Sequence, residues 1–454
     1  MSGVQPARRI AYEVIAAVRE SEAYANLLLP TRIRRAGLGG RDAGLATELT
    51  YGTLRGLGYY DAVIAIAARR PTSKIDPGIL DVLRLGTHQL LAMRIARHAA
   101  VDESVTLAKE VARSASGFVN GVLRTIGRSA PEAWQARVLD GVDGADARLA
   151  IEHSHPEWVV AALRRALAAE GRQAELAELL TADNAAPRVG VVALPGLAVP
   201  GELGGVPDRY SPVGAASESG DPAGTAAVAE GRARVQDEGS QLAALALSRA
   251  RPIAAGERWL DLCAGPGGKA ALLAAEAAAG GARFTANEIS PARAELVRQA
   301  LAALPVPPAV TEEDGRAIGT REPAAFDRIL LDAPCTGLGA LRRRPEARWR
   351  KRPSDVPELA AVQRSLLSSA LDALKPGGLL AYVTCSPHLD ETASVVDAVL
   401  AAREDARRLD TAAALAGVTV HRLELGDRPD GSVQLWPHRH GTDAMYISLI
   451  ERAL

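Results

Sequence analysis

The sequence predicts a doubly wound α/β domain that follows an all-helical domain. Two observations support this fold class. From Ala7 to Arg128, apolar residues recur at helical spacing, with breaks near Leu38 and Arg70. After Arg234, short apolar strands alternate with helices, which is typical of a parallel sheet covered by helices on both faces. At 454 residues, the chain is long enough for two or three domains.

The elements of the α/β region follow one another in a regular order. Apolar runs predict strands at 258–262, 283–287, 326–331 and 378–384. Periodic segments predict helices at 269–279, 291–303 and 356–374. The segments 432–436 and 444–450 have the pattern of two strands joined by a loop, and we expect them to form an antiparallel edge.

These elements suggest three regions with different compositions. The helical domain is expected at 1–140, a linker with a small subdomain at 141–233, and the α/β domain at 234–454. Within the middle region, 201–231 is rich in Gly, Pro, Ala and Ser. Composition does not distinguish a flexible linker from a lid there.

Composition and charge exclude several classes of protein. Hydrophobic residues make up 48% of the chain, which argues against wholesale disorder, and no uncharged apolar run reaches the length of about 18 residues that a membrane helix needs. No export signal is apparent, so we expect a cytoplasmic location. The net charge is −1, but residues 1–140 carry 19 Lys and Arg against 13 Asp and Glu, so the helical domain is basic. That asymmetry fits a surface that meets phosphates, although a solvated basic face would give the same count.

The segment after the first predicted strand has the composition of a nucleoside-binding loop. Glycines let the main chain approach a ligand closely, and the loop falls at the carboxyl end of a strand, where open α/β sheets bind ligands. It matches neither the dinucleotide fingerprint nor the phosphate loop, because Lys269 is followed by Ala270. We therefore expect a nucleoside without a phosphate chain, with Glu288 on the ribose hydroxyls and Asp314 on the adenine amino group. The loop residues expected to bind it are Cys263, Ala264, Gly265, Pro266, Gly267, Gly268 and Lys269, together with Asp332 from a later strand end.

Cysteines follow two of the later strands. Cys335 lies in Asp-Ala-Pro-Cys after one strand, and Cys385 lies in Thr-Cys-Ser after another, so both should lie at the same edge as the loop. A thiolate that adds to carbon 6 of a pyrimidine turns carbon 5 into a nucleophile, and Asp332 is placed to stabilise the charge that develops. Spacing alone does not choose between the two thiols. We expect Cys263 to be a small buried residue, and the three cysteines include no C-x-x-C pair that would indicate a zinc site or a disulfide framework.

These motifs resemble the Sun family of RNA cytosine-5 methyltransferases over roughly 234–454. The resemblance implies a Rossmann-like domain that uses S-adenosylmethionine, with Cys385 attacking the base and Cys335 assisting release of the product. It also implies that the base is a cytosine. This sequence departs from the family's pattern in Gly265, where alanine is commoner, and in Glu288, which replaces aspartate. A third departure is 443–446, Asp-Ala-Met-Tyr, which replaces a more aromatic ending.

The helical region resembles the NusB-type RNA-binding domain in 48–55 and 118–124. This pairing of domains is similar to that of the bacterial enzyme that methylates a cytosine of small-subunit ribosomal RNA, which makes ribosomal RNA the expected partner. The middle region would then add a small RNA-binding subdomain. Oligomeric state is not fixed by the sequence, and a monomer is the expectation.

A basic run follows the Pro-Cys motif and is expected to contact RNA phosphates, with Trp349 available for base stacking. An unpaired cytosine is the expected target, because a stacked base hides carbon 6. His438 and His440 lack a third ligand nearby, so we expect them to be structural or to contact RNA rather than to bind a metal. The residues expected to contact RNA are Arg342, Arg343, Arg344, Arg348, Arg350 and Lys351.

Three other functions are compatible with these patterns. One is an RNA-binding adaptor or assembly factor whose cofactor domain no longer catalyses, although intact Asp332, Cys335 and Cys385 count against it. Another is a methyltransferase that acts on an exocyclic amine, for which no thiol would be needed. The third is a cytosine-5 methyltransferase that acts on a different RNA, such as tRNA.

Overall fold

The computed structural model describes residues 3–21, 23–217 and 225–454, and its chain divides into two compact units. Unit 1 comprises residues 1–161, 180–185 and 341–350. Unit 2 comprises 162–179, 186–340 and 351–454. The predicted boundaries at 140 and 233 do not coincide with this division, because segments from the middle and the C-terminal regions pack into unit 1.

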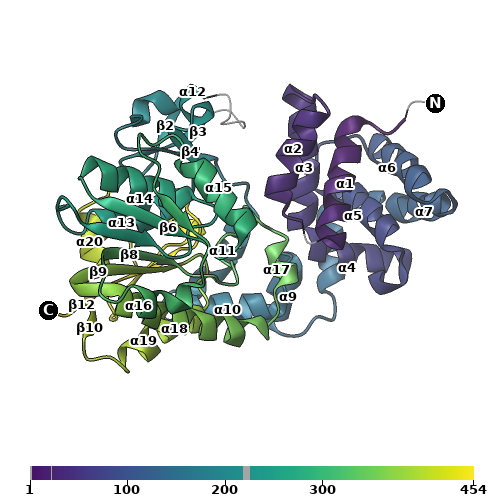
Figure 1. The fold of residues 1–454 in the computed structure, drawn as a ribbon. Coiled ribbons are helices and arrows are strands. Elements are labelled where there is room, and N and C mark those ends of the chain that lie inside the picture. Colours follow the sequence, from purple (N-terminus) through teal and green to yellow (C-terminus); the bar gives the residue numbers. More distant parts are fainter. Residues whose placement is uncertain (1–2, 22, 218–224) are drawn as a thin grey trace. The chain divides into compact units, whose positions relative to one another are not determined.

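Unit 1 is helical, as the spacing of apolar residues predicts (Figure 1). Helices begin where the sequence supplies start signals: Pro77 stands at the first position of its helix, and the Asp76 carboxylate accepts a hydrogen bond from the Ile79 amide at 3.1 Å. The apolar stripes meet in one core that includes Val14, Leu49 and Leu83. Its helices are α1 (Pro6–Glu20), α2 (Ala25–Arg35), α3 (Gly40–Arg55), α4 (Leu57–Ala68), α5 (Pro77–Leu91), α6 (Arg97–Val111), α7 (Ser116–Gly127), α8 (Pro131–Leu139), α9 (Ala145–Glu152) and α17 (Ala347–Arg350).

Helices α10 (Glu157–Ala168) and α11 (Leu176–Asp183) each run from one unit into the other. The region predicted as a linker with a small subdomain at 141–233 is therefore mostly structured. It also contains a four-stranded antiparallel sheet in the order β2-β3-β1-β4, with the short helix α12 (Ala226–Ala229). The strands are β1 (Gly190–Ala193), β2 (Gly205–Pro207), β3 (Gly214–Ser217) and β4 (Ala233–Val235). Part of the Gly- and Ala-rich stretch, 218–224, lies outside the described residues.

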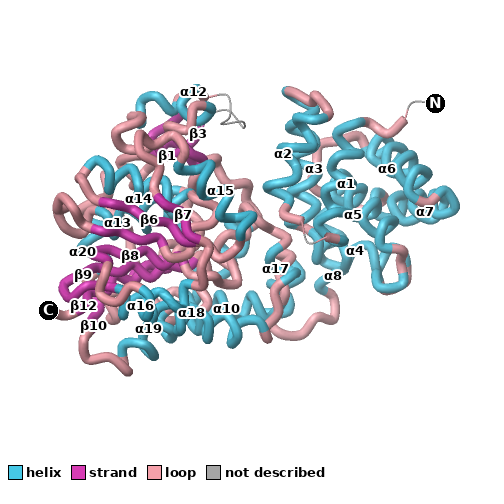
Figure 2. Tube along the Cα trace, viewed as in Figure 1, coloured by secondary structure: helices cyan, strands magenta, loops and turns pink. Residues whose placement is uncertain are grey.

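The large sheet of unit 2 runs in the order β10-β12-β9-β8-β5-β6-β7, with β11 paired to β12. Figure 2 shows its strands in magenta, with β12, β9 and β8 beside one another. Strands β7, β6, β5, β8 and β9 are parallel, whereas β12 is antiparallel to both of its neighbours, β9 and β10. The two predicted terminal strands pair antiparallel as β11 and β12, and β10, a strand that the sequence did not indicate, pairs with the other end of β12. The strands are β5 (Arg258–Asp261), β6 (Arg283–Asn287), β7 (Ala309–Thr311), β8 (Phe326–Asp332), β9 (Leu374–Thr384), β10 (Ala406–Arg408), β11 (Val433–Gln434) and β12 (Tyr446–Arg452).

Helices cover both faces of this sheet, which confirms the doubly wound α/β class. Alternate residues of one strand enter different cores: Leu330 packs into the core under α13 and α14, and its neighbours Ile329 and Leu331 pack into the core under α18 and α19. Figure 1 shows α13 and α14 on one side of the strands and α16, α18 and α19 on the other. The helices are α13 (Glu238–Ser248), α14 (Gly268–Ala279), α15 (Pro291–Leu301), α16 (Ile318–Arg321), α18 (Asp355–Ala373), α19 (Ala393–Leu400), α20 (Thr411–Ala416) and α21 (Pro437–His440).

The strand order changes direction between β5 and β8. From β5 the chain proceeds outward to β6 and β7, then returns to the other side of β5 to form β8 and β9. Loops at the carboxyl ends of β5 and β8 therefore leave in opposite directions and form the crevice in which such sheets bind ligands. The predicted loop follows β5, and Asp332 ends β8.

Candidate active site

The cofactor loop lies between the end of β5 and the start of α14. The Ala264 amide donates to the Asn287 carbonyl at 2.8 Å, and the Gly265 amide donates to Glu288 Oε2 at 3.0 Å. Gly267 has φ +106°, a backbone conformation that side chains other than hydrogen disfavour. The loop is thus held against the end of β6, and Glu288, 3% exposed, lies beside it as the sequence predicts.

Asn287 is a structural residue at this edge that the sequence reasoning did not single out. Its amide nitrogen donates to the carbonyls of Leu262 and Glu313, and its oxygen accepts from the Thr311 hydroxyl at 2.8 Å. One buried side chain thereby joins the ends of β5, β6 and β7. Asp314 follows on the β7 side, where Arg316 forms an ion pair with it at 2.6 Å; this hydrogen bond lowers the pKa of Asp314.

Unpartnered buried polar atoms next to the loop fit a nucleoside cofactor. Asp261 Oδ1 is buried and has no hydrogen-bond partner in the described part of the chain, and the same is true of both amide atoms of Gln236. The Gln236 amide lies by the loop, 3.8 Å from where a Cβ on Gly268 would stand. Burial, with the charge of Asp332, raises the pKa of Asp261 to about 8. A nucleoside's hydroxyl and amino groups are suitable partners for such atoms, so these residues fit S-adenosylmethionine.

Gly265 and Glu288 are sterically coupled. A Cβ on residue 265 would stand 2.2 Å from Glu288 Oε2, well inside contact distance, so the absence of a side chain at 265 makes room for the longer acid. We expect Gly265→Ala to weaken S-adenosylmethionine binding about 10- to 100-fold, and Glu288→Asp added to it to restore much of that loss. Calorimetric titration of the four proteins with the cofactor measures the coupling. If the losses of cofactor affinity in the two single variants simply add in the double variant, that result would contradict the steric coupling.

The two thiols predicted to act on the base lie together. Cys335 Sγ and Cys385 Sγ are 3.5 Å apart, beyond the ends of β8 and β9. The hydrogen bond with Cys385, together with burial, raises the pKa of Cys335 well above its ordinary value. Cys263 is separate from this pair: burial raises its pKa, and it packs against the core under α18.

Lys269 points from the cofactor loop to the thiol side of the site. Its Nζ donates to Asp332 Oδ2 at 2.8 Å. Burial alone would lower the pKa of Lys269, but the charge and hydrogen bond of Asp332, and the charges of Cys385 and Asp261, raise it. The ammonium therefore remains charged among these acidic groups.

Backbone hydrogen bonds join the loops that carry the thiols. The Gly339 amide donates to the Cys385 carbonyl at 2.8 Å, and the Ala444 amide donates to the Gly339 carbonyl at 2.8 Å. A Cβ on Gly339 would stand 2.1 Å from the Ala444 oxygen, so no other residue fits there without displacing a loop. The motif Asp443–Tyr446, which departs from the family pattern, thus forms one wall of this arrangement.

The basic run after Cys335 is only partly available for RNA. Arg342 and Arg348 are 6% and 0% exposed, so the prediction that they contact phosphates is wrong for this structure. Within unit 1, the Arg348 guanidinium donates to the Ser154 carbonyl at 3.0 Å and to Asn184 Oδ1 at 2.8 Å. Arg350 donates to the carbonyls of Val18 and Ala23. Arg344 is exposed and lies over the Tyr24 ring, while Arg343 and Lys351 are half-buried.

Arg348 should therefore stabilise unit 1. Arg348→Ala leaves buried carbonyls without a donor, and we expect the Tm of the transition that reports unit 1 to fall by roughly 5–10 °C. Arg344→Ala, an exposed change four residues away, should leave that Tm within about 1 °C. Calorimetry of both variants tests this structural role of Arg348. Equal Tm values for Arg348→Ala and Arg344→Ala would contradict it.

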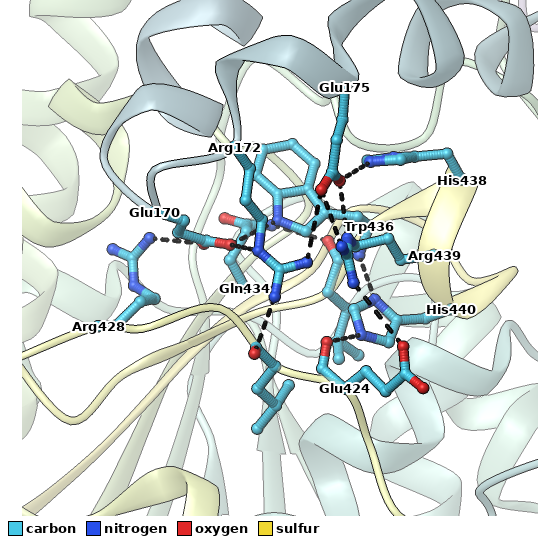
Figure 3. Close-up of polar contacts among 12 residues, drawn as sticks. Glu170, Arg172, Glu175, Glu424, Arg428, Gln434, Trp436, His438, Arg439 and His440 are labelled. Atoms are coloured by element: carbon cyan, nitrogen blue, oxygen red, sulfur yellow. Dashed lines mark hydrogen bonds and ion pairs between the residues drawn. The ribbon is translucent and has the colours of Figure 1, made fainter.

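His438 and His440 belong to a polar network that joins the C-terminal segment to the chain after α10 (Figure 3). Glu175 accepts from His438 Nε2 at 2.9 Å and from Arg439 at 2.7 Å; the Arg439 bond lowers the pKa of Glu175 to about 2. Burial lowers the pKa of His440 to about 4, and its Nδ1 accepts from the Trp436 amide at 2.8 Å. Both histidines thus have structural contacts. Within the described residues, no group of three or more His, Cys, Asp or Glu is placed to hold a metal, and no helix is long and apolar enough to cross a membrane.

A glycine loop at the end of β5, an acid at the end of β6 and unpartnered buried polar atoms at the switch point define a class, the S-adenosylmethionine-dependent methyltransferases. The family model described as 16S rRNA methyltransferase RsmB/F matches residues 251–451, and the NusB family model matches residues 5–128. The chain belongs to the RsmB/F family of S-adenosylmethionine-dependent RNA methyltransferases and carries an N-terminal NusB domain.

Similar proteins cover the chain almost completely. A methyltransferase of Mycobacterium tuberculosis strain H37Rv is 49% identical, over 99% of this chain and 97% of its own. The ribosomal RNA small subunit methyltransferase B of Pseudomonas putida is 33% identical, over 97% of both. The crystal structure of PH0851 has a TM-score of 0.80 at 21% identity and covers 99% of this chain and 100% of its own, which shows a shared fold.

Proposed function

We propose that this enzyme methylates carbon 5 of a cytosine in small-subunit ribosomal RNA through a covalent adduct with Cys385. The observation that carries the proposal is the thiol pair, 3.5 Å apart and next to the Lys269–Asp332 ion pair. Transfer to an exocyclic amine needs no thiol, so two adjacent thiols at this position favour attack at carbon 6. S-adenosylmethionine supplies an electrophilic methyl group when it is bound at the β5 loop.

Each step of the proposed reaction forms and breaks a stated bond. The Cys385 thiolate adds to carbon 6, so an S–C6 bond forms while the C5–C6 double bond opens. Asp332 is assigned to give a proton to the ring nitrogen, which neutralises the charge that develops there and leaves a carboxylate paired with Lys269. Carbon 5 takes the methyl group, its proton then passes to water, and breakage of the S–C6 bond restores the double bond and the Cys385 thiolate. We assign assistance in this release to Cys335.

Electrostatics supports the choice of Cys385 as the nucleophile, which spacing alone left open. The Lys269 ammonium interacts with Cys385, whereas Cys335 lies in the field of Asp332 and Glu391, two carboxylates. A cation favours a thiolate and an anion disfavours it. Two thiols this close do not both ionise readily, so the first proton to leave should be that of Cys385.

The choice of RNA rests on the relatives. The family model and the Pseudomonas putida relative both name the small-subunit ribosomal RNA, and the NusB domain supplies a second RNA-binding unit. The cytosine must be unpaired or displaced from its stack to reach Cys385. We also propose a monomer in the cytoplasm, where the three free cysteines would stay reduced.

Methyl transfer to defined RNAs tests this function. The purified protein is incubated with tritiated S-adenosylmethionine and unmodified small-subunit ribosomal RNA, large-subunit ribosomal RNA or a tRNA mixture, and 5-methylcytosine is mapped by bisulfite sequencing. We expect one protected cytosine in the small-subunit RNA alone. Protection confined to tRNA would change the substrate, label outside carbon 5 would change the reaction, and cofactor binding without transfer to any RNA or assembling subunit would favour the adaptor.

A further inference from the structure

Glu391 is a buried carboxylate that the proposed chemistry does not use. It ends the short 3₁₀ turn Leu389–Glu391 after β9, and its side chain is 0% exposed. The Tyr382 hydroxyl donates to its carbonyl at 2.8 Å, and its own amide donates to the His388 carbonyl at 2.9 Å. Its backbone is therefore fixed from both sides, and the carboxylate points inward.

The carboxylate accepts hydrogen bonds from the residues that directly follow the two thiols. Oε1 accepts from the Thr336 amide at 2.8 Å, and Oε2 accepts from the Thr336 hydroxyl and from the Ser386 hydroxyl, the latter at 2.7 Å. Thr336 follows Cys335 and Ser386 follows Cys385. One side chain thus connects the loop of each thiol to the same anchor.

Gln363 of α18 completes this arrangement. Its amide nitrogen donates to Glu391 Oε1 at 3.3 Å and to the Pro334 carbonyl at 2.9 Å, immediately before Cys335. The Cys335 loop is therefore held on both sides of the thiol. All of these donors are neutral, and burying an ionised carboxylate among neutral donors is costly compared with a neutral amide of the same shape. The hydrogen bonds alone therefore do not explain why residue 391 carries a negative charge.

The charge of Glu391 distinguishes the two thiols. The hydrogen bond with Cys385 and burial raise the pKa of Cys335 most, and the negative charges of Glu391 and Asp332 raise it further. The Lys269 ammonium interacts with Cys385. If both thiols ionised, two thiolates would stand side by side and compete for carbon 6. Two of the three hydrogen bonds that Glu391 accepts from the thiol loops come from Thr336, next to Cys335, so its negative charge favours the remaining proton on Cys335.

We propose that Glu391 is a positioning residue that fixes the Cys335 and Cys385 loops in register and directs the shared proton of the thiol pair to Cys335. The proposal rests on the proposed function for the roles of the two thiols. The order in which the two thiols lose their protons is a property of the protein alone and can be measured without RNA.

Alkylation of each thiol as a function of pH tests the proposal on the full-length protein. Iodoacetamide is applied across a pH series, and mass spectrometry gives a midpoint for each cysteine. In the wild type, Cys385 should react at lower pH than Cys335. Glu391→Gln removes the negative charge, stabilises the Cys335 thiolate, and should lower the Cys335 midpoint by about one pH unit. Glu391→Asp keeps the charge but shortens the side chain by one methylene, so it should lower the Cys335 midpoint less.

Asp390→Asn is the matched control. It removes the same charge one residue away, on a side chain that is 51% exposed, and should leave both midpoints unchanged. With a cytosine-5 RNA substrate, Glu391→Gln should lower kcat about 100-fold with little change in KM. Midpoints that stay at the wild-type values in a folded Glu391→Gln or Glu391→Asp protein would overturn the proposal even if kcat falls, because a merely structural carboxylate would give that result. Shifted midpoints support it even if the wild type forms no adduct with any RNA, an outcome that would contradict the proposed function instead.

Discussion

Replacing Cys385 with alanine will abolish methyl transfer, lowering turnover by about 10⁴-fold or more, because carbon 5 has no nucleophilic character unless a thiolate adds to carbon 6. Tritiated-methyl transfer to small-subunit ribosomal RNA measures the loss. Cofactor affinity should stay within a few-fold of the wild type, because Cys385 follows β9 while the cofactor loop follows β5. A Cys385→Ala protein that methylates at the wild-type rate would contradict the mechanism.

Cys335→Ala provides the matched comparison, since it removes the other thiol of a pair only 3.5 Å apart. If Cys335 assists release, this variant should attack the base and then fail to free it. The expected result is a protein–RNA adduct that survives denaturing electrophoresis and is absent from the double variant. If the adduct instead accumulates in Cys385→Ala and is absent from Cys335→Ala, then Cys335 is the nucleophile and Cys385 assists release.

Removing the charge of Lys269 is expected to have the second-largest effect. Lys269→Met leaves Asp332 without its ion-pair partner, next to Asp261, whose pKa burial has already raised to about 8. Losing the cation near Cys385 makes its thiolate less favourable, so the alkylation midpoint of Cys385 should rise, and kcat should fall by about 10²- to 10³-fold. The shift is opposite in sign to that expected for Cys335 in Glu391→Gln.

Lys269→Arg is the control for this change because it keeps the positive charge. It should retain a Cys385 midpoint within a few tenths of a pH unit of the wild type, even if the altered geometry slows turnover. A Lys269→Met protein in which Cys385 reacts at the wild-type pH would show that the ammonium does not set the state of the nucleophile.

Local sequence patterns were sufficient to predict most of the α/β domain. The strand at 283–287 coincides with β6, and the helix predicted at 269–279 begins one residue early as α14, because long apolar runs and a glycine loop are strong local signals. Strands β7 and β10 are three residues each, too short to show a period. The small sheet at 190–235 was missed because strands such as β3, Gly-Ala-Ala-Ser, have no branched or aromatic residues.

The site residues that lie in motifs at the ends of strands could be predicted from the sequence. The residues whose position depends on contacts with distant parts of the chain could not. Asp332 and Glu288 lie at the predicted edge because parallel strands share their carboxyl ends. Arg348 looked like part of a phosphate-binding run, but its partners, Ser154 and Asn184, are more than 160 residues away in the sequence. Glu391 gave no signal for a similar reason: an acid in a turn after a strand is ordinary, and only the fold brings Thr336 and Ser386 to it.

The most direct test of the account is to locate the covalent bond. The wild-type protein is mixed with S-adenosylmethionine and small-subunit ribosomal RNA transcribed with 5-fluorocytosine, whose fluorine blocks release after methylation, and the adduct is digested and mapped by mass spectrometry. The account predicts one nucleotide attached to the peptide that contains Cys385. An adduct on Cys335, or methyl transfer without any adduct, would contradict it.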